Sequence, residues 1–381
     1  MPWRARTVRP PLLRRRASRP QLKRDPLGSR PRSRPLRNSA LTATALSDWL
    51  RRSGALQSGA VADISVDLEI DTTISTLAFL IATYTPEVPA GMPRRLVVKS
   101  PHVPRKAGSD STGEGPFYRC VAPLLDGPPF VRCVAALDEA DGNPETIVLE
   151  DLRASHDHPP WPLPPSRAQC ELALDALVRV HAHWWEAPAL GHTVGRLHTA
   201  ERLTTMVHGI AAHLPAFIDS LGDALSAESR RVLERVFGSS LQPWLRLTDT
   251  RALTVAHGDA HTWNFLFPRS GRGPAFLIDW QLWHLDLGAR DLAFFMALHW
   301  YPERRRELER PLLEYYHRGL VARGLDTYPF DELWLDYRRC VVRNLTIPIL
   351  FWSRGMKPEG WWHRLECALA AYRDLGCDDL C

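Results

Sequence analysis

Three oxygen-bearing side chains lie close together in the sequence and could share one chemical task. HGDAHTWNFLF (257–267) contains Asp259 and Asn264, and FLIDWQ, which begins nine residues later, contains Asp279. A carboxylate and an amide oxygen suit a hard cation such as Mg²⁺, which shares its coordination shell with substrate phosphates. The carboxylate of Asp259 would then remain available to act on a substrate hydroxyl. The alternative is a polar turn without a chemical role.

The spacing predicts how two of these residues meet. We expect two antiparallel strands, one beginning at Asn264 and one ending at Asp279, joined by the turn-rich segment PRSGRGPA. A register that pairs Phe267 with Phe276 brings the two polar residues opposite each other. Directly opposite residues point to the same face, with Cα atoms about 4.5–5.5 Å apart. The amide and the carboxylate are therefore expected side by side at the open end of a hairpin.

The sequence around this hairpin predicts helices. ELALDALVRVHAHWW (171–185) has apolar residues at helical spacing, with one face formed by Leu172, Ala176, Leu177, Val180 and Trp184. Helical patterns continue to about Leu247 and resume at Asp291.

The front part of the chain predicts mostly strands. ISVDLEI, STLAFLIATY, RLVVKS and TIVLEDL are rich in β-branched and apolar residues, and a helix is expected for PFYRCVAPLL. Strand alternation in LVVK puts Leu96 and Val98 on one face, and Val97 and Lys99 on the other. A lone lysine is thus expected on an otherwise apolar strand.

The composition limits the class of protein. A chain of 381 residues is longer than one compact core usually needs, which favours two lobes with appendages. Residues 1–40 hold thirteen of the 48 basic residues but only one of the 43 acids, so the remainder is net acidic. The overall charge of +5 therefore does not indicate a nucleic-acid-binding fold. The Arg/Pro-rich tail lacks apolar periodicity and is expected to be disordered.

The cysteines and the apolar runs indicate the cellular compartment in which we expect the protein. Seven Cys are scattered without a CxxC pair, which fits reduced thiols in a cytoplasmic protein better than a disulfide framework. The longest aliphatic run, LAFLIA, is far too short to cross a membrane. We expect a cytoplasmic protein with no membrane partner, and the oligomeric state stays open.

The motifs together resemble those of a known superfamily. HGDAHTWN followed by LIDWQ is similar to the paired HGD and I-D-[FW] motifs of the aminoglycoside phosphotransferase / choline kinase superfamily. LIDWQLWHLDLGARDLAFF, LLEYYHRGLVARG, DYRRC and LVRVHAHWW resemble its ecdysteroid-kinase-like (CHK kinase-like) branch. The resemblance covers about residues 45–375, and several motifs agree in order and spacing.

The resemblance implies an ATP- and Mg²⁺-dependent phosphotransferase that moves the γ-phosphate to a hydroxyl of a small molecule. It gives Asp259 the role of catalytic base, and Asn264 and Asp279 the role of Mg²⁺ ligands. His257 is expected to brace the loop by hydrogen bonding rather than to transfer protons. Asp291, in GARDLA, matches the family's structural acid near a helix start, where N-capping is an adequate physical reason for it.

The resemblance also implies a nucleotide-binding front lobe. Lys99 matches the phosphate-binding lysine, although a charge that protects an edge strand would look the same. Glu114 matches the acid that pairs with this lysine, and the helix dipole alone would also favour an acid there. VLEDL resembles the interlobe hinge, where adenine would bind to the backbone of Glu150, Asp151 and Leu152. An ordinary strand end is the alternative.

One departure from the family pattern concerns the phosphate-covering loop. The corresponding segment, EIDTTIST (69–76), has no glycine, and glycine is what lets backbone N–H groups approach phosphate closely. The hydroxyls of Thr72, Thr73 or Ser75 would have to contribute instead. This departure supports the alternative function, a catalytically weak pseudokinase that binds nucleotide or acts as a scaffold.

The expected fold is α+β, a protein-kinase-like two-lobe fold with a small, mostly β N-lobe and a larger, mostly helical C-lobe. We expect a basic tail at 1–44, the N-lobe at 45–152 and the C-lobe at 153–381. The acceptor stays open, because fold does not fix substrate. Acids of the rear lobe would suit a cationic acceptor and its Trp residues a flat one, but such residues are more often core.

Overall fold

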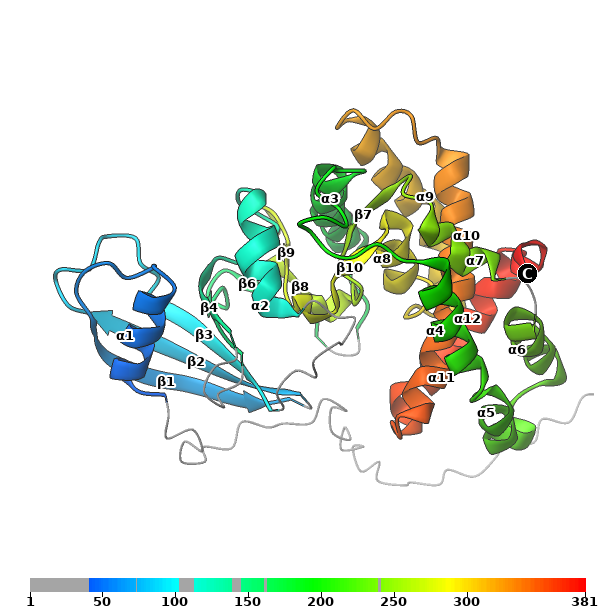
Figure 1. The fold of residues 1–381 in the computed structure, drawn as a ribbon, viewed down its shortest axis with the longest axis horizontal. Coiled ribbons are helices and arrows are strands. Elements are labelled where there is room, and N and C mark those ends of the chain that lie inside the picture. Colours follow the sequence, from blue (N-terminus) through cyan, green and yellow to red (C-terminus); the bar gives the residue numbers. More distant parts are fainter. Residues whose placement is uncertain (1–40, 73, 103–112, 139–144, 161–162, 239–240) are drawn as a thin grey trace, which may run out of the picture.

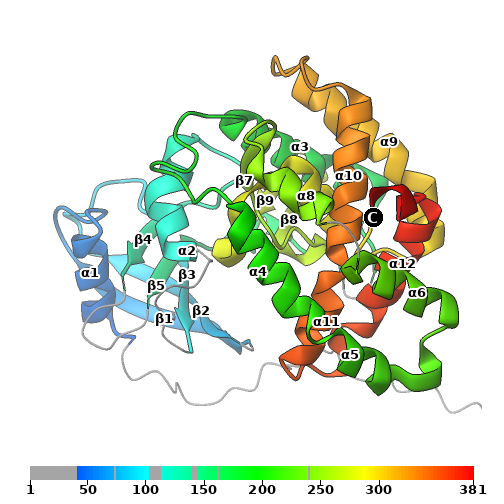
Figure 2. The same ribbon diagram turned by 45° about the vertical axis from the view of Figure 1, so that its right-hand side comes forward.

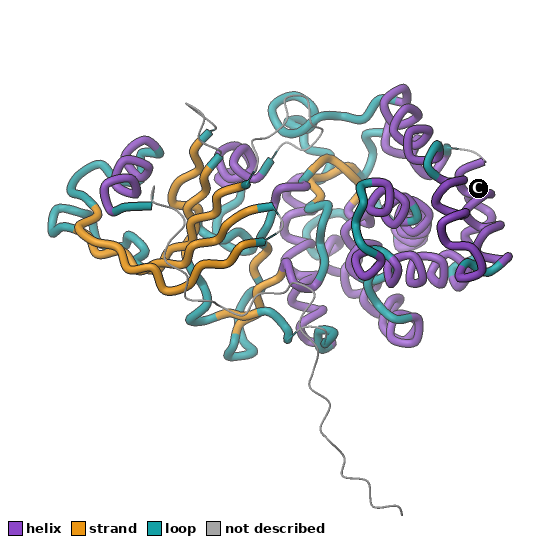
Figure 3. The backbone as a smooth tube through the Cα atoms, turned by 90° about the horizontal axis from the view of Figure 1, so that it is seen from below, coloured by secondary structure: helices purple, strands orange, loops and turns teal. Residues whose placement is uncertain are grey.

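The computed structural model describes residues 41–72, 74–102, 113–138, 145–160, 163–238 and 241–381. The tail 1–40, Thr73 and most of the Gly/Ser-rich loop, 103–112, lie outside the described residues. Strands gather towards one end of the molecule and helices towards the other (Figure 3). No helix among the described residues is both long and apolar enough to cross a bilayer.

A five-stranded antiparallel sheet forms the N-lobe (Figure 1). Its strands, in spatial order, are β1 (Val61–Asp71), β2 (Ser75–Tyr84), β3 (Arg95–Pro101), β5 (Thr146–Glu150) and β4 (Cys133–Leu137). The sequence predicted every strand except β4, whose segment CVAAL is short and does not alternate. In β3 the expected alternation is confirmed, because Leu96 and Val98 are buried in the core of the sheet whereas Lys99 contacts groups on the other side.

Helix α1 (Ala43–Arg52) covers one face of this sheet (Figure 1). Thr42 caps it by accepting the N–H of Ala45. Leu46 and Leu50, one turn apart, are buried against the strands. The helix begins at Ala43, so regular structure extends into the segment 1–44 that we expected to be disordered.

The chain that follows the loop 103–112 contains three short helical pieces instead of the one expected helix. They are α2 (Glu114–Pro116), a π-helical turn (Phe117–Val121) and a 3₁₀ turn (Ala122–Leu124). Pro123 has no N–H to donate, so the regular ladder cannot continue past it. The ring of Phe117 stacks on Trp280 with centroids 4.0 Å apart, which packs this segment onto the C-lobe.

The C-lobe is mostly helical, as predicted. Its helices are α3 (Arg167–Trp184), α4 (Ala200–Ala211), α5 (Leu214–Leu221), α6 (Ala227–Gly238), α7 (Gln242–Leu245), α8 (Gly288–Phe295), α9 (Pro302–Val321), α10 (Phe330–Asn344), α11 (Thr346–Ser353) and α12 (Trp362–Asp374). Helix α3 starts at a capping box of Ser166 and Gln169. Of its predicted apolar face, Leu172 is half-buried and the other members are buried.

Short strands carry the motif segments at the junction of the lobes (Figure 2). The pairs are β7 (Leu253–Ala256) with β10 (His284–Leu287), β6 (His156–Asp157) with β8 (Phe265–Pro268), and β8 with β9 (Phe276–Leu277). The loops that leave β7 and β9 contain the HGD and IDW motifs.

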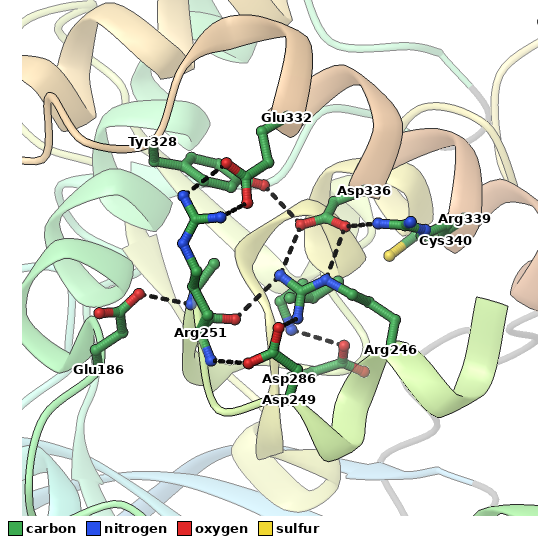
Figure 4. A network of polar contacts seen from close by, with 12 residues as sticks. Glu186, Arg246, Asp249, Arg251, Asp286, Tyr328, Glu332, Asp336, Arg339 and Cys340 are labelled. Carbon is green, nitrogen blue, oxygen red and sulfur yellow. Dashed lines mark hydrogen bonds and ion pairs between the residues drawn. The ribbon is translucent and has the colours of Figure 1, made fainter. Parts of the chain in front are cut away.

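A polar network connects helix α10 to neighbouring segments of the C-lobe (Figure 4). Asp336 on α10 is fully buried and accepts hydrogen bonds from Arg246 and Tyr328. Asp286 on β10 is equally buried and binds both terminal nitrogens of Arg343, from α10, at 2.9 and 2.5 Å. Buried carboxylates need such partners, and the Asp286–Arg343 pair joins β10 to α10.

Candidate active site

The HGD turn is held in place by a carboxylate from helix α8. Asp291 is fully buried and accepts the backbone N–H of His257 at 2.7 Å and that of Gly258 at 2.9 Å. The N-cap explanation for Asp291 is therefore wrong, because Leu287 occupies the N-cap and Asp291 is the fourth residue of the helix. The acid satisfies two buried donors that the turn would otherwise leave without an acceptor.

Only glycine fits the middle position of this turn. Gly258 has φ +81°, a conformation that residues with a side chain rarely adopt. A Cβ atom there would lie 2.3 Å from the carbonyl oxygen of Leu282 and 2.9 Å from the ring of His284. The glycine of the motif is thus required by backbone conformation and by lack of space.

Both ring nitrogens of His257 take part in hydrogen bonds within the described residues. Its Nε2–H donates to the carbonyl of Ile278 at 2.9 Å, and its Nδ1 accepts the N–H of Asp259 at 3.3 Å. Burial lowers the pKa of His257, against the effect of the charge of Asp291. The ring therefore connects the HGD turn to the chain just before Asp279.

Asp259 and Asn264 are in direct contact. The side-chain N–H₂ of Asn264 donates to the backbone carbonyl of Asp259 at 2.8 Å and approaches its carboxylate Oδ2 at 3.3 Å. Burial and the negative charge of Asp279 raise the pKa of Asp259 to about 7, although Arg364 and the bond from Asn264 act in the opposite direction. The carboxylate can therefore exchange a proton near neutral pH.

The β8–β9 hairpin has a different register from the predicted one. Phe276 pairs with Leu266, not with Phe267, which shifts the ladder by one residue. Asn264 consequently lies opposite Ile278, whose N–H donates to the Asn264 carbonyl at 3.0 Å. The predicted cross-strand pairing of Asn264 with Asp279 is wrong, because loop geometry sets the register of a short hairpin.

A backbone turn brings Asp279 to the site. Strand β9 ends at Leu277, and Asp279 takes the left-handed conformation with φ 66° and ψ 56°, which Asp tolerates better than most residues. Its Oδ1 accepts a hydrogen bond from Lys99 Nζ at 2.5 Å. The spacing argument assumed an extended strand up to this residue and missed the turn.

Lys99 links the two lobes through two carboxylates. Its Nζ lies 2.6 Å from Glu114 Oε2 in addition to its contact with Asp279. Glu114 is buried and its other oxygen accepts the N–H of Trp280 at 3.3 Å. Although burial opposes it, the charges of the two acids raise the pKa of Lys99 above its usual value. The lysine is therefore a fixed cation at the junction of the lobes.

The hinge segment offers less to a ligand than we expected. The N–H of Glu150 donates to the carbonyl of Arg132 at 2.9 Å, and that of Asp151 donates to the carbonyl of Arg95 at 3.0 Å. These two N–H groups are engaged within the protein. Within the described part of the chain, we find no hydrogen-bond partner for the N–H of Leu152.

The glycine-free loop closes on itself. The hydroxyl of Thr72 donates to the Ser75 carbonyl at 2.8 Å and lies 3.1 Å from the Ser75 hydroxyl. Ser75 is buried, and Thr73 lies outside the described residues. The hydroxyls of Thr72 and Ser75 thus bond each other in this structure.

Two residues of the site were missed by the sequence reasoning. His181, within the α3 motif LVRVHAHWW, donates to Asp291 at 3.2 Å while its Nδ1 accepts the hydroxyl of Tyr316 at 2.7 Å. Its presence in that motif was an available signal. Arg364, on α12, lies close enough to Asp259 for the two charges to affect each other's pKa, and no motif pointed to it.

A comparison of the sequence with protein-family models identifies the family of the chain. A family model described as "Ecdysteroid kinase-like family" matches residues 125–326, which is more than half of the chain. The chain belongs to the ecdysteroid kinase-like family. The matched range includes the HGD and IDW motifs of this ecdysteroid kinase-like chain, whereas Lys99 and Glu114 precede it. No curated protein matches the chain as a relative.

Solved structures of small-molecule kinases share the fold of this family member. A candidate aminoglycoside phosphotransferase from Ralstonia eutropha JMP134 is 15% identical, with a TM-score of 0.54 over 88% of this chain and 99% of that one. Amicoumacin kinase hAmiN, in complex with AMP-PNP, Ca²⁺ and Ami, is 14% identical, with a TM-score of 0.50 over 87% and 92%. At such identities the likeness concerns the fold, so the chain has the expected two-lobe, kinase-like α+β fold.

Proposed function

We propose that the protein is an ATP- and Mg²⁺-dependent phosphotransferase that moves the γ-phosphate to a hydroxyl of a small molecule. The observation that carries this proposal is the meeting of Lys99 with Asp279 beside the contact between Asp259 and Asn264. Phosphoryl transfer depends mainly on positioning and charge neutralisation, and these are the groups that it requires. Membership of the ecdysteroid kinase-like family supports the same reaction class.

The available oxygen atoms fit Mg²⁺ bound together with nucleotide phosphates. Asn264 uses its N–H₂ group towards Asp259, and its Oδ1 has no donor among the described residues. Asp279 offers the second oxygen ligand. No cluster of three His, Cys, Asp or Glu side chains that could bind a metal occurs in the described ranges, which suits an ion that takes several ligands from phosphate and water. When bound, Mg²⁺ would neutralise charge on the phosphates.

Asp259 is the proposed base for the acceptor hydroxyl. Its pKa of about 7 allows it to take up a proton near neutral pH. Asn264 holds the carboxylate by hydrogen bonding, and the Asp291-bound N–H groups of His257 and Gly258 fix the turn on which it lies. The base is therefore oriented before the substrate arrives, which is the main contribution that a protein makes to this reaction.

Lys99, positioned by Glu114, is the proposed contact for the nucleotide phosphates. At the hinge, the N–H of Leu152, which has no hydrogen-bond partner among the described residues, is the backbone donor that we assign to adenine. Glu150 and Asp151 would hold the strand end. The proposed location is the cytoplasm, because dispersed thiols without a disulfide framework are typical of a reducing compartment.

A catalytically weak pseudokinase is the second candidate. The observation that favours it is the loop in which Thr72 and Ser75 bond each other and thus offer little to a phosphate. Measurements of nucleotide binding and of turnover distinguish the two functions, because a pseudokinase would bind nucleotide without turnover.

The test measures both properties on the full-length protein. Calorimetry with AMP-PNP and Mg²⁺ gives nucleotide binding, and ADP formation with a panel of hydroxylated metabolites gives turnover. We expect Mg²⁺-dependent ADP formation, with a phosphorylated alcohol visible by mass spectrometry and lost in Asp259→Asn. Nucleotide binding without ADP formation would favour the pseudokinase, and the absence of nucleotide binding would contradict both.

A further inference from the structure

Arg364 is a half-buried cation that forms no direct ion pair with a carboxylate of the described residues, although the charge of Asp259 acts on it from a greater distance. Its Nε–H donates to Nε2 of His299 at 3.3 Å, a terminal nitrogen donates to the carbonyl of Gly360, and the guanidinium lies 5.5 Å from the ring centroid of Phe351. Within the described residues, no carboxylate lies within 4.0 Å of it. An unpaired charge removed from water is costly, so a fixed guanidinium of this kind is suited to a ligand that supplies the negative charge.

The groups next to Arg364 lead to the proposed catalytic base. The ring of His299 lies 5.7 Å from the ring of His261, and His261 Nε2 lies 3.7 Å from Asp259 Oδ2. His299 is neutral in this arrangement, because its Nδ1–H donates to the Phe294 carbonyl and its Nε2 accepts from Arg364. Among the described residues, the buried Nδ1 of His261 has no hydrogen-bond partner.

The acids that act most strongly on the pKa values of Arg364 and His261 are Asp259 and Asp279, and both belong to the catalytic machinery proposed above. Glu366, two residues from Arg364 in the sequence, is exposed to solvent. A cationic acceptor would meet Arg364 as a like charge, whereas an anionic one would meet its counter-ion.

Arg364 lies on the side of the site where the acceptor would bind, and the proposed nucleotide contacts lie on the other side. The proposed nucleotide contacts, Lys99 and Glu114, belong to the N-lobe and approach the site from there. Helix α12, which carries Arg364, lies in the C-lobe away from the five-stranded sheet (Figure 1). A hydroxyl that reaches Asp259 from the side opposite the nucleotide thus comes from the neighbourhood of Arg364.

We propose that Arg364 is a specificity residue that binds an anionic group of the acceptor, so that the substrate class is an alcohol bearing a carboxylate or a similar acid. This inference rests on the proposed phosphotransferase function and names its substrate class. Charge-assisted hydrogen bonds from a guanidinium to a carboxylate provide both the affinity and the orientation.

Three alcohols on one aromatic frame test the charge preference. They are 4-(hydroxymethyl)benzoate, its amide 4-(hydroxymethyl)benzamide, and 4-(hydroxymethyl)benzylamine. Binding to the full-length protein is measured by calorimetry with AMP-PNP and Mg²⁺ present, and ADP formation is measured separately with ATP. We expect the benzoate to bind about tenfold or more tightly than the amide, and the amine to bind least.

Three variants test whether Arg364 causes the preference for the benzoate. They are Arg364→Gln, Arg364→Lys and Arg354→Gln. Arg364→Gln should remove the preference for the benzoate and leave the affinity for the amide nearly unchanged, and Arg364→Lys should retain part of the preference. Arg354, an exposed arginine at the end of α11, is the matched control, and Arg354→Gln should behave as the wild-type protein. Thermal unfolding verifies that each variant is folded. If Arg364→Gln does not fold, Arg364→Lys replaces it in the test.

The outcomes distinguish this inference from the proposed function. No charge preference in the wild-type protein, no measurable binding of the benzoate, or the same preference in Arg364→Gln would overturn the inference. An equal loss for all three alcohols in Arg364→Gln would assign Arg364 to the support of Asp259 and would also overturn it. Arg364-dependent binding of the benzoate without ADP formation would leave the inference standing and contradict phosphotransfer.

Discussion

The carboxylate of Asp291 accepts the backbone N–H of Gly258 at 2.9 Å, across 33 residues of sequence. The second oxygen of the same carboxylate accepts the N–H of His257 and the Nε2–H of His181. Although burial opposes ionisation, these donors lower the pKa of Asp291. The turn that presents Asp259 is therefore fixed by a single anion on α8.

Replacing Asp291 by Asn should weaken the fold and the site together. The amide offers one acceptor oxygen and places an N–H₂ group against buried donors, so we expect a loss of about 2–4 kcal/mol in the free energy of unfolding. ADP formation should fall more than nucleotide affinity. Urea denaturation and calorimetry measure the two effects. Asp326→Asn, at an exposed position, is the control, and a similar small loss in both variants would contradict the role of Asp291.

Gly258→Ala should be far more damaging than an alanine at another glycine with positive φ. Gly324 has φ +87° but open space where a Cβ would lie, so Gly324→Ala should cost only the conformational strain, about 1–2 kcal/mol. Gly258→Ala adds the clash with the Leu282 carbonyl and should cost about 3 kcal/mol or more. Urea denaturation compares the two. Equal losses would show that space at Gly258 does not matter.

Asp259→Asn and Asp279→Ala should separate catalysis from nucleotide binding. The first keeps the size of the side chain and removes the base, so turnover should fall about 10²–10⁴-fold while nucleotide affinity stays nearly unchanged. The second removes a proposed metal ligand and a partner of Lys99, so it should weaken nucleotide binding and raise the Mg²⁺ concentration required. Calorimetry with AMP-PNP and assays of ADP formation check both. Equal, mild effects would contradict this division of roles.

The Asp286–Arg343 pair should make stability depend on pH in the acid range. Although burial opposes ionisation, Arg343 and His284 hold the pKa of Asp286 well below its usual value. Because the folded pKa lies below the unfolded one, the ionised group stabilises the fold above about pH 4, and this stabilisation declines as the pH falls towards the folded pKa. The variant Asp286→Asn has no ionisable group at this position and therefore lacks this pH-dependent stabilisation.

The measurement is the difference in the free energy of unfolding between the wild-type protein and Asp286→Asn. We expect about 3–5 kcal/mol near neutral pH, shrinking below about pH 4. Asp48→Asn breaks the exposed pair with Arg51 and should differ from the wild-type protein by less than about 1 kcal/mol. A difference for Asp286→Asn that is constant from neutral to acid pH would contradict the prediction.

The sequence by itself determined the element types and the residues available for chemistry. Strand β2 has the predicted bounds, and alternation alone placed Lys99 opposite the buried Leu96 and Val98. These features depend on local periodicity, which a single sequence contains. The family likewise followed from motif order, because the motifs are local.

The tertiary structure decided how these residues meet. The left-handed turn at Asp279, the register of the β8–β9 hairpin and the contact of Asp291 with the HGD turn depend on packing between segments far apart in the sequence. Arg364 reaches the neighbourhood of Asp259 from the last long helix, and no local spacing relates the two residues. Local pattern predicts which side chains are present, whereas long-range packing fixes their distances, and the chemistry of the site depends on those distances.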